Sequence, residues 1–319
     1  MAIVYGISQS ERTVISKTPD SIKNITDVDN THIKLTSELY YSKKEFLASL
    51  PDKIKEKKKV LDEIEKNKTL IGKNYDDKIK QLDAKKAEGA LKSVLSNIRI
   101  AAIKHYSKPK EMREIHKIEN NHKIKLQALQ KNPQELFEKA FKEERDEIQI
   151  FDSIKVSPEY KGAKGEVRVL DKLFQLSNDF HVFCDVQISL PKFVHYRGRK
   201  NLGSAQMDFV VVSTRGIVMI EVKNWSTKYY KQNSGLSPHE QTERAGLVLW
   251  IALKSWRRYP KVTRVLLSVQ DNMNYNPKYK HVAVSKINKI NQYIQTRKDN
   301  LPEKEVKRIV TLLKKFVPK

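Results

Sequence analysis

A long stretch of the chain, from about Ser42 to Gln149, is almost free of glycine and rich in Lys, Glu, Leu and Ile. In its first half, apolar side chains recur at heptad spacing with two lysines interrupting the series: Leu61, Ile64, Lys68, Ile71, Tyr75, Lys78 and Leu82. A second series follows it: Leu91, Leu95, Ile98 and Ala102, then Ile115, Ile118, His122 and Leu129. This periodicity predicts long amphipathic helices rather than strands.

The two series need a partner for their apolar faces. A turn fits between them at Lys85 to Gly89, and Pro109 should bend or break the second helix. The product is either an antiparallel helical hairpin or a coiled-coil dimer. Lys68 and Lys78 weaken a parallel dimer, which favours the hairpin. Residues 42–150 therefore serve packing or association, with a homo-oligomer or an effector protein as the possible partner.

Charge is divided unevenly along the chain. Residues 161–319 hold 30 Lys and Arg against 12 Asp and Glu, whereas the first 160 hold 32 against 26. The first part mixes both signs, as solvated helices do. A cationic surplus on the second part attracts phosphate backbones, so we expect a nucleic acid as its partner.

Other features of the composition exclude several classes of protein. Cys184 is the only cysteine, which rules out an intrachain disulfide or a cysteine-cluster zinc site and fits a reducing cytoplasm. No apolar run approaches the roughly 20 residues of a membrane helix. The first residues lack a basic region followed by a long apolar stretch, so we expect no signal peptide.

After Pro158 the pattern changes to alternating helices and strands. We expect a helix over Lys164–Leu176, a strand over Val182–Leu190, a basic polar loop over His195–Gly203, and dense apolar strands over Asp208–Ser213 and Ile217–Lys223. A helix should follow from Ser237 to about Trp256, opened by the capping box Ser237-Pro-His-Glu240. The last elements are strands over Val262–Val269 and near His281–Val284, and helices around Ile287–Ile294 and Val306–Phe316. Residues 1–35 carry short β-like runs, Ala2–Tyr5 and Thr13–Ile15, without a clear place. The order predicts an α/β sandwich around a small mixed sheet.

The hairpin between the two dense strands concentrates the chemistry. Glu221 and Lys223 are two residues apart on one strand and project from the same face. If Thr214 and Arg215 form the loop, Ser213 pairs with Gly216 and Asp208 stands opposite Glu221. Sliding by one full pair sets Asp208 opposite Lys223 instead. Both registers gather the three side chains on one face, whereas a three-residue loop without a bulge does not.

Two carboxylates in an apolar, cationic surround call for a counterion. From Val186 to His239 the only acidic residues are Asp208 and Glu221, among eight Lys and Arg. A divalent cation relieves the repulsion between them, and oxygen ligands favour Mg²⁺ or Mn²⁺ over zinc. The ion can hold a phosphate and lower the pKa of a bound water, while Lys223 orients that water and offsets negative charge on the phosphate.

These residues stand in a recognisable order: Gly165-Glu166, Gln206-Met-Asp208-Phe-Val-Val-Val-Ser213, Gly216-Ile217, Glu221-Val-Lys-Asn-Trp225, then Pro238 and Gln241. Over roughly residues 160–285 the chain resembles the nuclease-related domain (NERD), a branch of the PD-(D/E)xK nuclease superfamily. The resemblance implies a restriction-endonuclease-like sandwich. It also implies Asp208 and Glu221 as metal ligands, Lys223 as the catalytic lysine and Glu166 as an accessory acid. Met207 stands where isoleucine is more usual, a conservative apolar exchange.

Two further catalytic candidates have alternative readings. Glu166 lies on the side of its helix shared by Leu170 and Leu173, so it either contacts the metal or is an acid favoured by a helix N-terminus. Gln241 begins the face continued by Ala245 and Val248. It either binds a metal-bound water or phosphate or satisfies backbone groups.

Candidate nucleic-acid contacts come from the basic segments around the hairpin. Residues 254–298 hold eleven Lys and Arg against one acid, with Tyr259, Tyr275, Tyr279 and Tyr293 interleaved. We select these basic residues as contacts: Arg197, Arg199, Lys200, Lys228, Arg257 and Arg258. No motif of base-reading side chains is present, so no sequence specificity follows.

The sequence thus predicts four regions: an unassigned segment 1–41, a helical hairpin or coiled coil over 42–156, a nuclease-like domain over 157–298 and a basic amphipathic helix over 299–319. The leading hypothesis is a Mg²⁺-dependent DNA endonuclease, acting by family analogy in defence against foreign DNA or in DNA processing. One alternative is a non-catalytic DNA-binding scaffold with a coiled coil for oligomerisation. Another is a partner-docking subunit whose hairpin recruits an effector.

Overall fold

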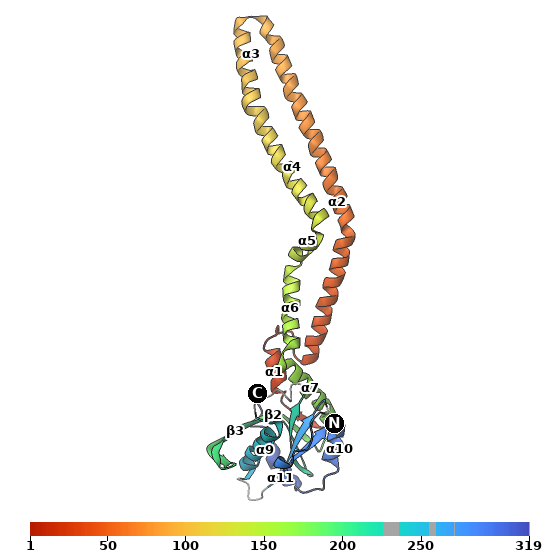
Figure 1. Cartoon of the computed structure of the whole chain (residues 1–319), viewed down its shortest axis with the longest axis vertical. Coiled ribbons are helices and arrows are strands. Elements are labelled where there is room, and N and C mark those ends of the chain that lie inside the picture. The colour runs from red at the N-terminus through yellow and green to blue at the C-terminus, as the bar shows by residue number, and fades with distance from the viewer. Residues whose placement is uncertain (226–235, 255–259, 271, 319) are drawn as a thin grey trace. The chain divides into compact units, whose positions relative to one another are not determined.

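The computed structural model describes residues 1–225, 236–254, 260–270 and 272–318. The chain forms two compact units, shown in Figure 1. One, here called the α/β unit, combines Met1–His32 with Gln149–Lys319, and the other, the hairpin unit, comprises Ile33–Ile148. Both ends of the chain therefore contribute to the same unit. No helix among the described residues is long and apolar enough to cross a membrane.

The hairpin unit is built from long helices joined by short breaks. Helix α2 covers Ile25–Ala84, followed by a 3₁₀ turn at Lys85–Glu88, α3 at Ala90–Ala102, a π-helical segment at Ile103–Ser107, α4 at Lys108–Lys131, α5 at Pro133–Ala140 and α6 at Lys142–Val156. The start of α2 and the end of α6 belong to the α/β unit. The predicted turn between two helices is confirmed. Pro109 lies in the first turn of α4, directly after the π-helical segment, so regular α-helix is interrupted at that point as expected.

Side-chain contacts between α2 and α4 show that the two helices are antiparallel, because residues later in α2 contact residues earlier in α4. Lys68 Nζ lies 3.3 Å from Glu119 Oε2, Tyr75 donates to Glu111 at 2.6 Å, and Lys108 donates to Asp76 at 2.6 Å. Lys123 and Lys68 lower the pKa of the buried Glu119 carboxyl. Of the two alternatives, the chain therefore forms the antiparallel hairpin. Lys68, one of the interrupting lysines, supplies an ion pair across it.

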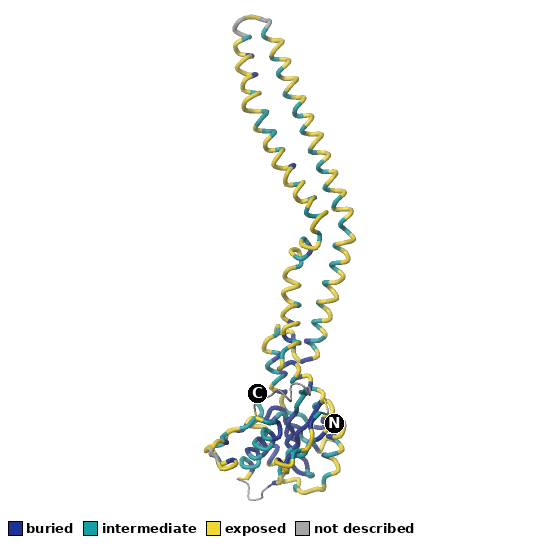
Figure 2. The backbone as a smooth tube through the Cα atoms, viewed as in Figure 1, coloured by how far each residue is buried: buried dark blue, intermediate teal, exposed yellow. Residues whose placement is uncertain are grey.

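The prediction that the second apolar series forms the buried face of the hairpin is only partly correct. Leu95 and Ile98 are 50% and 62% exposed, while Ser96 and Ile100 are buried in their place. In α4, Ile118 is likewise 51% exposed, and the neighbouring Glu119 is buried instead. Figure 2 shows the hairpin helices mostly exposed or half-buried, in contrast to the buried centre of the α/β unit.

The α/β unit contains a six-stranded mixed sheet among its described residues. Its order follows the chain: β1 (Ile3–Tyr5), β2 (His181–Tyr196), β3 (Arg199–Ser213), β4 (Gly216–Lys223), β5 (Val262–Ser268) and β6 (Val282–Lys286). Strands β2, β3 and β4 pair antiparallel, whereas β1 pairs parallel to β2 and β4, β5 and β6 are parallel. The predicted mixed sheet is confirmed.

Helices cover both faces of this sheet. Helices α7 (Pro158–Phe174) and α10 (Ile290–Gln295) pack on one face, where Val169 and Leu173 meet Phe209 and Val211. Helices α9 (Pro238–Lys254) and α11 (Glu303–Leu313) bury an equivalent set of apolar residues against the other face. The result is the three-layer α/β sandwich that the order of elements predicted.

Two local predictions are wrong. Thr13–Ile15 is the end of helix α1 (Gln9–Ile15) rather than a β-like run, because Ser8 caps the helix by accepting from Glu11 N and Val14 is buried. The basic segment His195–Gly203 is a paired hairpin rather than a loop. Arg197 and Gly198 have φ values of 49° and 80°, which fits a two-residue type I′ turn.

The α/β unit is larger than residues 157–298. It includes β1 and α1 from the segment that the sequence left unassigned, and α11 from the last 21 residues buries Val306, Ile309, Val310 and Leu313 in its core. Helix α9 starts at Pro238 as predicted, because Ser237 Oγ accepts from Glu240 N at 3.1 Å. Trp256, at the expected end of that helix, lies outside the described residues.

Candidate active site at the carboxyl end of β4

The β3–β4 hairpin has the first of the two registers considered. Ser213 pairs with Gly216 and the ladder continues to Phe209 opposite Ile220, which leaves Asp208 opposite Glu221 as the next position. Gly216 has a φ of 109°, and a Cβ there would lie 2.9 Å from Asn300 Oδ1. The two-residue loop of Thr214 and Arg215 therefore aligns the acidic residues as predicted.

A cavity of about 630 Å³ opens where this register ends. Four predicted catalytic residues line it together: Glu166, Asp208, Glu221 and Lys223. Helix α7 brings Glu166 close because Gly165 has no side chain, since a Cβ at that position would lie 2.7 Å from Asn224 Cβ. Side chains distant in sequence are thus collected at one end of the sheet.

Asp208 is half-buried, while Glu166 and Glu221 are each 8% exposed. Asp208 Oδ2 accepts a hydrogen bond from the backbone N–H of Val222 in β4 at 2.6 Å. Burial, then the nearby Glu221 and Glu166 carboxylates, raises the pKa of Asp208 well above its usual range. The site therefore disfavours the negative charge on Asp208 unless a cation is supplied.

Lys223 and Glu221 form an ion pair inside the cavity. Lys223 Nζ donates to Glu221 Oε1 at 2.8 Å, and the two side chains are 15% and 10% exposed. Burial by itself lowers the pKa of Lys223, but the Glu221 and Asp208 carboxylates outweigh it and the pKa is raised. Lys223 therefore remains a cation and a hydrogen-bond donor at neutral pH.

Glu166 has one oxygen satisfied and one free. Ser10 Oγ donates to its Oε1 at 2.7 Å, while its buried Oε2 has no hydrogen-bond partner within the described part of the chain. An unpaired buried carboxylate oxygen is costly, so it favours a ligand that brings positive charge or a donated proton. Of the two readings for Glu166, this geometry favours a role in the cavity.

Several other residues of the cavity were not selected from the sequence. They supply polar groups at its edge: Gln9, Ser10, Lys161, Gln206, Asn224 and Gln270. Gln206 and Asn224 stand within the matched motifs and could have been chosen on that ground. Ser10 lies 156 residues before its hydrogen-bond partner Glu166, and no local sequence pattern predicts such a contact.

A buried polar network supports Gln206. Asp185, with a φ of 53° and 1% exposure, lies in β2 between the pairs Cys184–Phe209 and Val186–Met207, which puts it beside Asp208. Its carboxylate accepts from Gln206 and forms an ion pair with Arg12 of α1. The N-terminal helix therefore contributes to the surroundings of the site.

The remaining candidates lie elsewhere. Gln241 is on α9, on the other face of the sheet from α7, and is not among the residues that line the cavity. Arg197 occupies the hairpin turn, where its guanidinium donates to Glu243 Oε2 at 2.9 Å and lies 4.4 Å from the Tyr279 ring centre. Arg199 and Lys200 begin β3. Lys228, Arg257 and Arg258 lie outside the described residues.

The donor set fits a divalent cation that prefers oxygen. Among the described residues no group of three or more His, Cys, Asp or Glu side chains is arranged around a common metal position. Mg²⁺ in phosphate chemistry commonly uses only one or two protein carboxylates, with water and substrate phosphate as its other ligands. Asp208 and Glu221 supply two carboxylates, and the free Glu166 oxygen adds negative charge to the same cavity.

Comparison with known protein families agrees with this arrangement. Residues 161–262 match the family model of the nuclease-related domain, NERD. The match begins near the start of α7, ends at the first residue of β5 and contains all four carboxylate and lysine candidates. No curated protein and no solved structure matches the chain. The resemblance seen in the sequence is thus confirmed, and it indicates a nuclease-related function.

Proposed function

We propose that the α/β unit is a metal-dependent nuclease that hydrolyses phosphodiester bonds of DNA, cutting within the strand. The observation that carries this proposal is the meeting of Glu166, Asp208, Glu221 and Lys223 in one cavity. The match to a nuclease-related domain over the same residues supports it. The PD-(D/E)xK fold is part of the proposal, and the mixed sheet with helices on both faces is compatible with it.

Asp208 and Glu221 would hold the cation, with Glu166 as an accessory acid. Mg²⁺ or Mn²⁺ bound there supplies Lewis acidity toward the phosphate and lowers the pKa of a water. Cation binding also requires Asp208 to lose its proton, which its buried surroundings oppose until the positive charge arrives. The site is therefore built to be completed by the ion.

Lys223 acts as a fixed positive charge in this proposal. In the metal-free site the Glu221 and Asp208 carboxylates raise the pKa of Lys223, which favours its ammonium form. Its ammonium can orient the attacking water and stabilise negative charge that develops on the phosphate. The ion pair with Glu221 holds Nζ in place for this role.

The partner and the setting follow from charge. The surplus of Lys and Arg after residue 160 favours a polyanion, and DNA is the substrate we propose. The reduced, buried Cys184 fits action in the cytoplasm. By analogy with nuclease-related proteins, we propose a role in defence against foreign DNA or in DNA processing. The hairpin unit would then serve association with a second copy or an effector.

The test is cleavage by the pure protein. Supercoiled plasmid, linear duplex and single-stranded DNA are incubated with Mg²⁺, Mn²⁺ or EDTA. We expect nicking or linearisation of the plasmid with Mg²⁺ or Mn²⁺ and none in EDTA. DNA binding without cleavage under every condition would overturn the proposal and leave the non-catalytic scaffold.

A further inference from the structure

A second cavity, of about 770 Å³, lies at the other end of the parallel strands. Its floor includes the first residues of β5 and β6, Val262 to Arg264 and Val282 with Ala283. The carboxylate cavity lies beyond the last pairs of the same strands, where Lys223 stands opposite Ser268. A seven-residue strand spans about 20 Å, and the two cavities share no lining residue.

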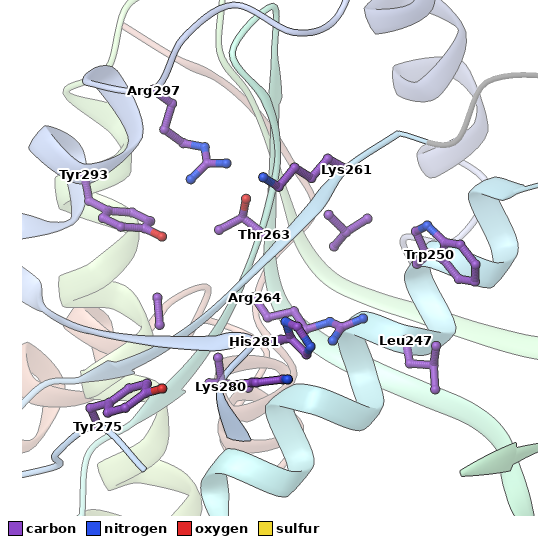
Figure 3. A pocket seen from close by; sticks show the side chains of 13 residues that line it. Leu247, Trp250, Lys261, Thr263, Arg264, Tyr275, Lys280, His281, Tyr293 and Arg297 are labelled. Atoms are coloured by element: carbon purple, nitrogen blue, oxygen red, sulfur yellow. The ribbon is translucent and has the colours of Figure 1, made fainter. Parts of the chain in front are cut away.

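The chemistry of this cavity is opposite to that of the first. None of its thirteen described lining residues is acidic. Five of them carry or can carry positive charge: Lys261, Arg264, Lys280, His281 and Arg297. In Figure 3, Arg264 and His281 lie toward the middle of the view, with Lys261 and Arg297 above them. Such a lining favours an anionic ligand.

Arg264 lines the cavity and packs against α9. Gly246 of α9 makes room for it, because a Cβ there would lie 2.6 Å from Arg264 Cδ and Nε. Its Nε is buried and has no hydrogen-bond partner among the described residues, and the same is true of Arg297 Nε. Desolvated guanidinium donors without acceptors are costly, and phosphate oxygens satisfy them well.

Aromatic rings occur in the same cavity. Figure 3 shows Tyr275 and Tyr293 on one side and Trp250 on the other. Tyr275 is 58% exposed, so much of its side chain is accessible to a ligand. Rings beside cations suit a ligand that has both a flat base and a phosphate, because bases stack on aromatic side chains while guanidinium groups bind the backbone. An acidic peptide or a simple anion would use the cations and leave the rings without a role.

We propose that this cavity binds an unpaired nucleotide, with basic side chains of the lining on its phosphate and Tyr275 against its base. The nucleotide comes either from a single-stranded nucleic acid or from a free nucleoside phosphate. A base-paired duplex is disfavoured because its bases are already stacked. The binding is independent of cleavage, so it can be true whether or not the proposed nuclease activity is found.

Binding is measured with the whole protein in EDTA, which separates it from cleavage. The probes are a fluorescein-labelled single-stranded oligonucleotide, a duplex of the same sequence, AMP and inorganic phosphate. Anisotropy follows the two nucleic acids, and calorimetry follows the two small ligands. Competition by AMP against the single strand shows whether both sources occupy one site.

The first variant removes two exposed charges, Lys261→Ala with Lys280→Ala. Its matched control, Lys304→Ala with Lys307→Ala, removes two exposed charges of α11 that do not line the cavity. We expect the first pair to weaken single-strand binding about tenfold and the control pair about twofold or less. Equal weakening by both pairs would mean that only the net charge matters and would overturn the proposal.

The second variant tests stacking, with Tyr275→Leu compared with Tyr106→Leu, a tyrosine that is 77% exposed in the hairpin unit. We expect about a fivefold loss of single-strand or AMP affinity for Tyr275→Leu and no change for the control. Loss with AMP assigns a free nucleotide as a source, and loss with the single strand alone assigns a nucleic acid chain. Phosphate binding as tight as AMP, with Tyr275→Leu silent, would overturn the proposal.

Discussion

The two cavities of the α/β unit lie at opposite ends of the same parallel strands and differ in almost every physical property. The one at the carboxyl end of β4 holds buried carboxylates whose charges repel, and the one at the amino ends of β5 and β6 holds cations and aromatic rings. In our proposal a cation completes the first, and an anionic nucleotide occupies the second. One sheet thus carries a site suited to chemistry and a site suited to holding a nucleotide.

Because the two cavities differ in charge, their residues should contribute to different properties of the protein. Removing a carboxylate from the first cavity removes repulsion as well as a ligand, so the protein should stay folded while its activity is lost. Removing a cation from the second leaves the carboxylates untouched. We therefore expect that catalysis and binding can be disabled independently.

The largest effect is expected from Asp208→Ala, Glu221→Ala and Lys223→Ala. Each removes a metal ligand or the fixed charge beside the phosphate, and we expect plasmid cleavage to fall by about 100-fold or more. Single-strand binding in EDTA should remain within about twofold, because the cationic cavity is unchanged. Normal cleavage by all three folded variants would show that the chemistry occurs elsewhere.

Metal exchange should act on the first cavity alone. We expect cleavage with Mg²⁺ or Mn²⁺ and inhibition by Ca²⁺, which fits oxygen ligands but holds water and phosphate less tightly. Single-strand binding should be nearly the same with each ion at equal ionic strength. Full cleavage in excess EDTA would contradict the role given to Asp208 and Glu221.

A smaller effect concerns stability and pH in metal-free protein. Because the pKa of Asp208 is raised on folding, folded protein keeps a proton there that the unfolded chain loses. From the usual aspartate pKa up to the raised value, the free energy of unfolding should therefore fall as pH rises. Asp208→Asn removes this contribution, and urea unfolding in EDTA at a series of pH values should show a flatter profile. An unchanged profile would argue against the buried, repelled carboxyl.

The smallest effect on activity is expected from removing the hairpin unit. His32 and Asp152 are joined by a 2.8 Å contact within the α/β unit, so a short Gly/Ser loop can replace residues 33–148. We expect the shortened protein to fold and to cleave DNA within about threefold of the full chain, because the α/β unit has its own core. Circular dichroism checks folding. A folded but inactive protein that no longer binds DNA would make the hairpin unit the nucleic-acid grip.

The sequence predicted the grouping of the residues at the first cavity for a local reason. Asp208, Glu221 and Lys223 lie on two strands joined by a two-residue loop, so their relation depends on one register that the apolar pattern and Gly216 define. Glu166 was available through its helix face. Gln241 does not line this cavity. The periodicity of its helix predicted which side of the helix faces the core, but not which face of the sheet the helix covers.

The second cavity and the N-terminal contributions could not be predicted in the same way. Arg264, Tyr275, Tyr293 and Arg297 come from separate elements, and only the packed sheet brings them together. Ser10 and Arg12 reach Glu166 and Asp185 across more than 150 residues of chain. In the hairpin unit, heptad counting placed Leu95, Ile98 and Ile118 inward, whereas Ser96, Ile100 and Glu119 are the buried residues.

The most direct test of the account is the binding of Mn²⁺ itself, measured by electron paramagnetic resonance without DNA. Asp208→Asn and Glu221→Gln are compared with the full protein, and Glu243→Gln is the control. Glu243 is a partly buried acid paired with Tyr196 and Arg197, outside the carboxylate cavity. We predict that the full protein and the control bind Mn²⁺ alike, while both site variants bind it about tenfold or more weakly. Undiminished Mn²⁺ binding by Asp208→Asn and Glu221→Gln would contradict the assignment of this cavity as the metal-dependent site.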